Sequence, residues 1–452
     1  MHLQKPPSGR KIGSMKKQST TTKHLINLIE FRQAVYEQGL TRGRDAQFEL
    51  VDALLVSRRI NSFVELSLSP VHRRKWPSAY AAIKQGQQDK ALLRALFVDQ
   101  LPQEETSIFS LDSSVWAHPS ARTLEGLMYA HVSTQTVPKG SVVKGHAYSL
   151  LGYVPDPQKS WALPLSTERI RVEKNVIQTG VEQIKALCQA LDDRLKVFVG
   201  DGRYGNHRFL SAVRNLEAAF LVRLRCDRVL YTEPGPYQGR GRPRVHGDRF
   251  AFKESDTWHT PVEDLTFEHE RYGTVRLRRW NQLHAKQDSE TPFAVMLAEI
   301  HLERDKPPKP IWLAYTGPPD RDVRTCWACY PYRWPVEPSF RFRKQRLHWT
   351  LPCFQQSSFC DRWTLLIDIA YWQVYLARQL VRDNPLPWQK ALATLTPGRI
   401  LQGIGPLFAR IGTPATAPKL RGKSPGWVNG RFRTPPKRFI PVKRGKKLAQ
   451  SA

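Results

Sequence analysis

A series of short apolar runs between residues 107 and 224, separated by amphipathic segments, most constrains the fold of this chain. Candidate helices cover 172–191, where apolar residues recur at helical spacing, and 208–216. Candidate strands cover 108–112, 145–154, 161–170, 196–200 and 218–224. Strands that alternate with helices in the order β-β-β-α-β-α-β indicate an α/β core built on a mixed sheet.

Two of these strand candidates end in an aspartate, Asp112 and Asp201. Either one alone is typical of a strand-end turn, but polar residues at carboxyl ends of strands also face the crevice where α/β proteins bind ligands. Two carboxylates within about 4 Å repel by roughly 4 kcal/mol at an effective dielectric of about 20, and a divalent cation between them reverses the sign. Oxygen ligands with few His or Cys nearby favour Mg²⁺ or Mn²⁺ over zinc.

A third acid, Glu337, follows Tyr330 and Arg333 and precedes Arg341 and Lys344. On a helix, Glu337, Arg341 and Lys344 lie on one face, since they are four and then three residues apart. That face offers one metal ligand and two phosphate-binding cations. An amphipathic helix with an internal Glu–Arg pair is the alternative interpretation.

The spacing Y-x2-R-x3-E-x6-K, made here by Tyr330, Arg333, Glu337 and Lys344, resembles the signature of the bacterial insertion-sequence superfamily of DDE transposases. Residues 199–206, with Tyr204 three residues after Asp201, resemble the second-acid motif of that group. Residues 112–125 resemble the first-acid region, although Ser113 stands where some relatives carry a second aspartate. The resemblance covers about residues 107–381.

The resemblance implies a ribonuclease-H-like catalytic core and two Mg²⁺ (or Mn²⁺) ions held by Asp112, Asp201 and Glu337. Asp112 and Asp201 would hold one ion and Asp112 and Glu337 the other. The reaction would hydrolyse double-stranded DNA at transposon ends and transfer the freed 3′-OH to target DNA, with a homodimer assembled on the DNA. Tyr330, Arg333 and Lys344, with Arg341 beside them, would bind phosphates.

Two alternatives remain open at this point: another ribonuclease-H-like DNA nuclease, and a catalytically inactive DNA-binding protein derived from a transposon. The net charge of +30 favours a nucleic-acid partner in every case. After Asp383 the chain has no acidic residue and carries 14 Lys and Arg, which is typical of a flexible tail that neutralises phosphates.

We therefore expect an α/β fold whose ribonuclease-H-like core, a mixed sheet flanked by helices, carries a β-rich insertion, a helical N-terminal domain and a basic C-terminal tail. The boundaries are a disordered basic segment at 1–24, a helical DNA-binding domain at 25–101, the first part of the core at 102–226, the insertion at 227–310, the second part of the core at 311–382, and the tail at 383–452.

The insertion contains Arg240 and Arg242 in an R-G-R-P sequence. A flat Arg-Gly-Arg-Pro segment suits the narrow minor groove of A·T-rich DNA, although short Arg-Gly-Pro runs are also ordinary loops. The basic run 69–86, which contains Arg73 and Arg74, is compatible either with a helical DNA-binding module or with an ordinary helical bundle.

The six cysteines do not form a disulfide framework. The spacing of Cys326, Cys329, Cys353 and Cys360 departs from that of zinc knuckles, so buried free thiols are favoured over zinc ligands. His118 and His146 are expected to be structural. No signal peptide is apparent, and the apolar stretch 363–381 is interrupted by polar residues, so we expect a bacterial cytoplasmic, nucleoid-associated protein that does not enter a membrane.

Overall fold

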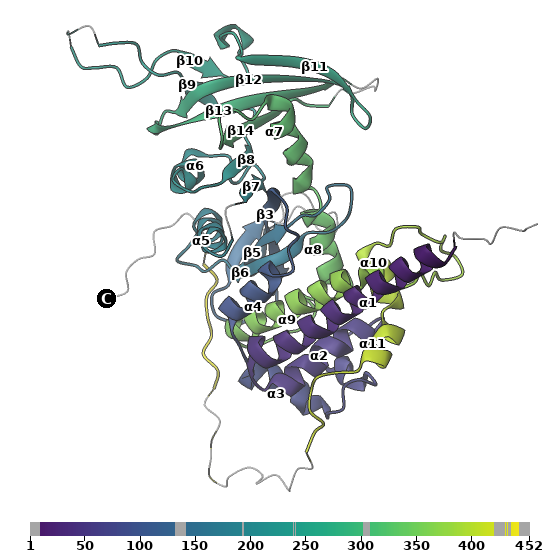
Figure 1. Ribbon diagram of the computed structural model, residues 1–452. Coiled ribbons are helices and arrows are strands. Elements are labelled where there is room, and N and C mark those ends of the chain that lie inside the picture. The colour runs from purple at the N-terminus through teal and green to yellow at the C-terminus, as the bar shows by residue number, and fades with distance from the viewer. Residues whose placement is uncertain are drawn as a thin grey trace, which may run out of the picture. The chain divides into compact units, whose positions relative to one another are not determined.

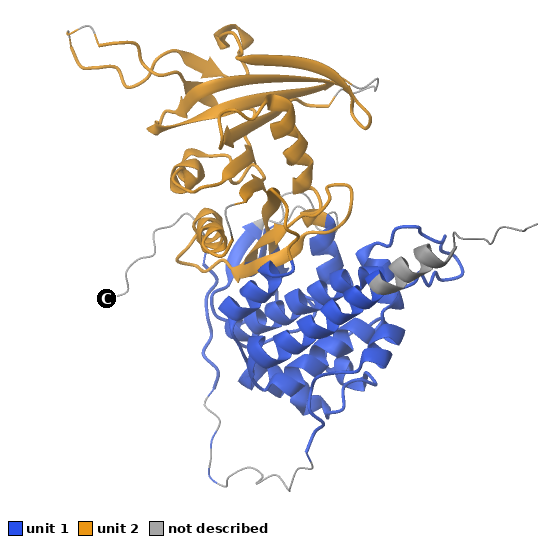
Figure 2. Ribbon diagram, viewed as in Figure 1, with its two compact units in different colours: residues 1–100, 115–147, 338–452 blue, residues 101–114, 148–337 orange. Residues whose placement is uncertain are grey.

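The computed structural model describes residues 10–131, 142–191, 194–237, 239, 241–301, 308–419, 430, 432 and 435–442. The chain divides into two units, which are described separately (Figure 2). Unit 1 comprises residues 1–100, 115–147 and 338–452, and unit 2 comprises residues 101–114 and 148–337.

Unit 1 is mainly helical. Its elements are α1 (Arg10–Ala34), the π-helical turn η1 (Val35–Gly39), α2 (Arg44–Val56), η2 (Phe63–Leu68), α3 (Trp76–Gln85), α4 (Lys90–Val98), most of α8 (Val336–Gln345), α9 (Ser357–Leu376), η5 (Ala377–Gln379), α10 (Pro397–Gly403) and α11 (Gly405–Ile411). A small sheet pairs β1 (Leu40–Arg42) with β2 (Gln87–Gln88). In Figure 1, α1, α2, α3 and α9 lie side by side.

Helix α9 forms the centre of unit 1, where it packs against α1, α2, α3 and α10. Its residues Trp363, Tyr371 and Trp372 are fully buried. A buried ion pair joins Arg32 of α1 to Asp52 of α2 at 2.8 Å, beside Gln373 of α9. The apolar stretch that the sequence suggested to be a buried helix is therefore the core helix of this unit. Within the described residues, no helix is long and apolar enough to cross a membrane.

Two expectations about the chain ends are wrong for part of their ranges. Helix α1 begins at Arg10, so residues 10–24 are helical. Its residues Leu28 and Phe31 are buried, and the chain between Ser14 and Leu28 contains no proline or glycine that would end the helix. Residues 397–411 form α10 and α11, where Ile400, Ile404, Leu407 and Phe408 recur at helical spacing and are buried.

The basic run 69–86 contributes to the interior of unit 1. Arg73 and Arg74 both contact Glu49, a buried residue of α2, at 2.8 and 3.3 Å. Arg73 also donates to the Ala415 carbonyl and Arg74 to the Thr416 carbonyl. These two arginines hold the chain after α11 against α2, which agrees with the helical-bundle interpretation of this run.

Unit 2 contains most of a large mixed sheet, with strands in the order β10-β9-β12-β13-β14-β8-β7-β3-β5-β4, β11 on β12 and β6 on β5. The strands are β3 (Thr106–Ala117), β4 (Met128–His131), β5 (Val142–Tyr153), β6 (Leu163–Arg169), β7 (Leu195–Gly200), β8 (Ala219–Arg223), β9 (Val229–Tyr231), β10 (Arg249–Ala251), β11 (Glu263–His269), β12 (Gly273–Ala285), β13 (Asp288–His301) and β14 (Ile311–Thr316). Strand β4 and parts of β3 and β5 belong to unit 1.

The helices of unit 2 are α5 (Val176–Cys188), α6 (His207–Val213), η3 (Ser255–Thr257), α7 (Val323–Cys329) and η4 (Tyr330–Arg333). Figure 1 shows α5 and α6 on one side of the central strands and α7 on the other. Helix α5 is shorter than the sequence suggested because Asn175 and Gln178 form a capping box at its start. Within residues 227–310 the described strands are β9 to β13, and β12 and β13 extend the central sheet through β14.

Buried side chains alternate between the two faces of β7 and β8. Phe198 and Phe220 stack on each other on the face covered by α6, whose Phe209 contacts Phe220. Val199 and Leu221 belong to the core cluster on the opposite face, which also contains residues of α7. This period of two decides which face each following side chain occupies.

Candidate active site

Three polar residues lie side by side where three parallel strands reach the same level. Leu111 of β3 is opposite Gly200 of β7, and Gly200 is opposite Val222 of β8. The next residue on each chain is Asp112, Asp201 and Arg223 respectively. Because neighbouring strands are about 4.8 Å apart, this register makes the three residues neighbours in a row.

The row belongs to the face of the sheet that α7 and η4 cover. Val199 and Leu221, two residues before Asp201 and Arg223, lie in the core cluster that also contains Tyr330 of η4. Burial raises the pKa of Tyr330, Arg223 lowers it and Asp201 raises it. These electrostatic effects agree with the register and place Tyr330 close to both residues.

Asp112 differs from its expected position in the strand. The sequence suggested a short strand ending at Asp112, but β3 continues to Ala117, so the acid lies inside the strand. Burial, followed by the neighbouring Asp201 carboxylate, raises the pKa of Asp112 to about 6. The Ser113 amide, which donates to Asp112 Oδ1 at 2.7 Å, and the cations Arg203 and Arg333 lower it.

The turn after β7 fixes Asp201. Its Oδ1 accepts the Arg203 amide at 3.0 Å, and Asn206 caps α6 by accepting the Phe209 amide at 3.2 Å. Gly205 must be glycine, since a Cβ there would lie 1.9 Å from the Arg223 carbonyl oxygen. The turn therefore packs directly on the end of β8, which brings Arg223 and Asp201 together.

The sequence did not single out two basic residues of this region. Arg203 donates to the Ser113 hydroxyl and lies 4.0 Å from Asp201, so it links the two acid-bearing segments. Arg223 is exposed at the end of β8. Arg203 stands within the motif that follows Asp201, which is a usable sequence signal. Arg223 is recognisable only from the register of β7 with β8.

Glu337 lies at the start of α8 and accepts a hydrogen bond from Arg333 Nη2 at 3.4 Å. Its side chain is 53 % exposed, whereas Arg333 and Tyr330 are buried. Arg333 also lowers the pKa of Asp112, so this cation acts on both the first acid and the third. Among the described residues, the carboxylate oxygens of Asp112, Asp201 and Glu337 do not all lie within 4.8 Å of one another.

The remaining sequence candidates are Arg341, Lys344, Arg240 and Arg242. Arg341 and Lys344 belong to unit 1, where Arg341 is exposed and Lys344 Nζ donates to the Val115 carbonyl at 3.0 Å. Burial, followed by Arg343, lowers the pKa of Lys344 to about 8. Arg242 is exposed, and Arg240 lies outside the described residues.

Cys326 and Cys329 behave as the sequence suggested, as buried thiols. Their Sγ atoms donate to the carbonyls of Arg321 and Thr325, and burial raises the pKa of Cys326 to about 12. Cys360 is also buried, while Cys353 is exposed.

The acid-bearing end of the sheet fits a divalent cation. Burial and then repulsion from the Asp201 carboxylate raise the pKa of Asp112, and carboxylate oxygens are the donors that Mg²⁺ and Mn²⁺ prefer. A cation between Asp112 and Asp201 would remove that repulsion. Arg203 and Arg333 supply part of the same compensation.

Comparison with known proteins gives one family. The sequence model of the family described as DDE superfamily endonuclease matches residues 35–287, more than half of the 452 residues. The match contains Asp112 and Asp201 and ends before Glu337. No curated protein matches the chain. Among solved structures, the chain is similar to a "piggyBac transposase synaptic complex with hairpin DNA", with a TM-score of 0.41 and 10% identity over 90% of this chain and 84% of that one.

Proposed function

Since this chain belongs to the family of DDE superfamily endonucleases, we propose that it is a DNA transposase of the insertion-sequence superfamily. The observation that carries the proposal is the in-register pair Asp112 and Asp201, where burial and then the neighbouring Asp201 carboxylate raise the pKa of Asp112. The Tyr330, Arg333, Glu337 and Lys344 spacing supports the same superfamily. The reaction proposed is cut-and-paste transposition within a bacterial cell, at the nucleoid, by a homodimer on DNA.

Asp112, Asp201 and Glu337 are the residues that would hold Mg²⁺ or Mn²⁺, in two ions. When bound, the ions would lower the pKa of water and stabilise charge on phosphate oxygens. Arg333, a group of the protein itself, would bind a DNA phosphate. It would release Glu337 once metal ions bind the carboxylates. Its guanidinium is held in place by contact with the Trp334 ring at 4.2 Å, which keeps it ready for bidentate binding.

Basic residues around the acids would bind the phosphates beside the cut. Arg223 and Arg203 are exposed or half-exposed at the same sheet end. Lys344 and Arg341 remain proposed phosphate contacts, as do Arg240 and Arg242 in the minor groove. The helical domain at 25–101 and the basic residues after Asp383 would also bind phosphates.

The experiment that tests the function uses labelled duplex DNA carrying the ends of the element that encodes this chain. With Mg²⁺ we expect nicking at the transposon boundary and, when target DNA is added, joined products; both disappear with EDTA. Cleavage of branched or damaged DNA without joining would favour another ribonuclease-H-like nuclease. Metal-independent binding without cleavage would favour an inactive DNA-binding protein.

We expect Arg223→Gln to weaken DNA binding uniformly across sequences, because it removes one cation from the row beside the acids. The slope of log K against log salt should become less negative by about 0.9, the value for one phosphate contact on B-form DNA. Fluorescence anisotropy at several salt concentrations measures this slope.

Arg225→Gln is the matched control for this variant. It makes the same charge change two residues later, on an exposed arginine paired with Asp227 at 3.1 Å. An equal change of slope in both variants would show that Arg223 contributes only to the general positive charge.

A further inference from the structure

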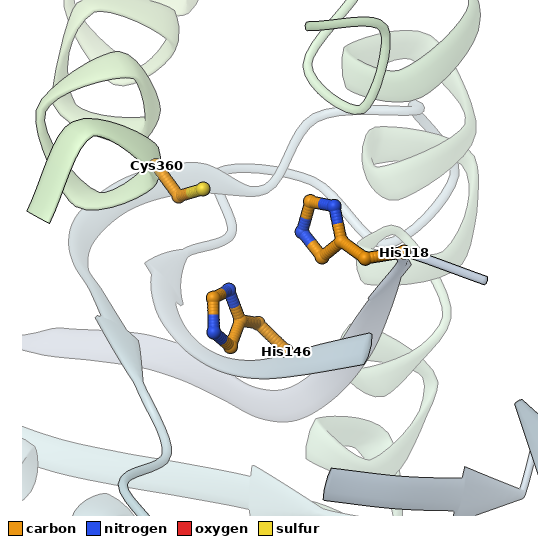
Figure 3. Close-up of side chains that lie close together, drawn as sticks. All are labelled: His118, His146 and Cys360. Atoms are coloured by element: carbon orange, nitrogen blue, oxygen red, sulfur yellow. The ribbon is translucent and has the colours of Figure 1, made fainter. Parts of the chain in front are cut away.

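Three potential metal ligands meet in unit 1. The ligand atoms of His118, His146 and Cys360 all lie within 4.8 Å of one another. Figure 3 shows the two imidazole rings and the thiol directed toward one another. All three residues are buried, with His118 the most accessible at 6 %. The sequence predicted structural roles for both histidines. For Cys360, as for the neighbouring cysteines, it predicted a buried free thiol.

The backbone brings these residues together from three elements. His118 follows β3, and its amide donates to the Lys144 carbonyl at 2.8 Å, which aligns it with the start of β5. Gly145 allows this close approach, since a Cβ there would lie 2.2 Å from the Trp116 carbonyl oxygen. His146 is the next residue, and Cys360 comes from the first turn of α9.

A hydrogen bond orients His146 as in a metal ligand. Its Nε2 lies 2.8 Å from the Glu125 carbonyl oxygen, which only accepts, so Nε2 must carry the proton and Nδ1 the lone pair. The Glu125 carboxylate also accepts a hydrogen bond from Ser357 at 2.8 Å, at the start of α9. One residue therefore fixes both the imidazole and the helix that carries Cys360, as outer partners of metal sites do.

His118 contributes a nitrogen suited to metal binding. Its Nε2 is buried and has no hydrogen-bond partner in the described part of the chain. Such a buried polar atom costs free energy unless something binds it. Burial, followed by His146, lowers the pKa of His118 to about 4, so the ring is neutral at pH 7, the form that binds metals.

We propose that His118, His146 and Cys360 bind a zinc ion that holds β3, β5 and α9 together. Two imidazole nitrogens and one thiolate are a ligand set that zinc takes, and one that Mg²⁺ avoids. Bond lengths of about 2.1 Å to nitrogen and 2.3 Å to sulfur separate tetrahedral ligand atoms by about 3.5 Å, so small rotations of these side chains close the site. The fourth position is left to water.

Cobalt(II) titrated into the metal-free full-length chain tests the site directly. We expect a thiolate-to-cobalt absorption band in the near ultraviolet and tetrahedral bands in the visible, all abolished by stoichiometric Zn²⁺. Cys360→Ser should lose the near-ultraviolet band, and His118→Asn should lower the zinc content from one ion per chain to background. Cys353→Ser, at an exposed cysteine nearby in the sequence, and Cys326→Ser should keep both signals.

A readout on the unaltered chain keeps the proposal testable if these variants misfold. With Mg²⁺ already present at saturation, Zn²⁺ should raise the thermal unfolding temperature of the zinc-free chain further, because a second ligand of the folded state adds to its stability. Equal cobalt bands in the unaltered chain and Cys360→Ser, or zinc content at background in the unaltered chain, would overturn the site. Neither readout depends on DNA cleavage.

Discussion

Replacing Asp201 with asparagine is expected to slow DNA strand cleavage by roughly a thousandfold or more, on the order of 4 kcal/mol of transition-state free energy. The asparagine oxygen can still accept the Arg203 amide, so the turn after β7 keeps its shape while the charged ligand is lost. Single-turnover cleavage of labelled end DNA at saturating protein measures the rate. DNA affinity in EDTA should remain within a few-fold of that of the unaltered chain.

Asp227→Asn is the matched control, since Asp227 is an exposed acid on the same unit, paired only with Arg225 among the described residues. It should leave the cleavage rate unchanged. Cleavage by Asp201→Asn at more than about a tenth of the normal rate would remove Asp201 from the metal-binding set, because loss of a charged ligand costs several kcal/mol.

Asp112→Asn is expected to stabilise the metal-free chain at neutral pH while abolishing cleavage. The folded-state pKa of Asp112 is about 6 against 3.8 for the free side chain, so ionising it in the folded protein costs up to about 3 kcal/mol. Asparagine avoids that cost, and its oxygen can still accept the Ser113 amide. Urea unfolding in EDTA at pH 7.5 measures the gain.

The sign of the pH dependence follows from the direction of this pKa shift. A carboxyl group with a raised pKa binds its proton more tightly in the folded state, so stability falls as pH rises from about 3.8 through about 6. The advantage of Asp112→Asn should therefore grow by about 1–1.5 kcal/mol between pH 5 and pH 8. Asp227→Asn should show no such growth. A constant difference between Asp112→Asn and the unaltered chain would contradict the raised pKa.

Mg²⁺ should reduce the stability difference. The ion binds the ionised pair in the unaltered chain and compensates the repulsion, whereas Asp112→Asn has lost one of the two charges. We therefore expect the stability of the unaltered chain to rise toward that of the variant as Mg²⁺ is added. The combined pattern separates a metal site from a pair of acids that is merely destabilising.

Local sequence patterns predicted much of this molecule because each is decided within a few residues. The apolar run before Asp201 is β7, and the run at 218–224 contains β8. At the chain ends, predictions that relied on composition and not on the spacing of apolar residues were wrong. Charge suggested a flexible tail after Asp383, but the spacing of Ile400, Ile404 and Phe408 was the stronger local signal.

The sequence by itself determined which residues can do chemistry: carboxylates after apolar runs, a Tyr-Arg-Glu-Lys spacing, and an excess of cations. Only the tertiary structure decided which of them meet, because strand register and sheet order are set by packing between distant segments. Register put Arg223 in the row with Asp112 and Asp201. Packing of α9 brought Cys360 to His118 and His146, a grouping that no local spacing contains.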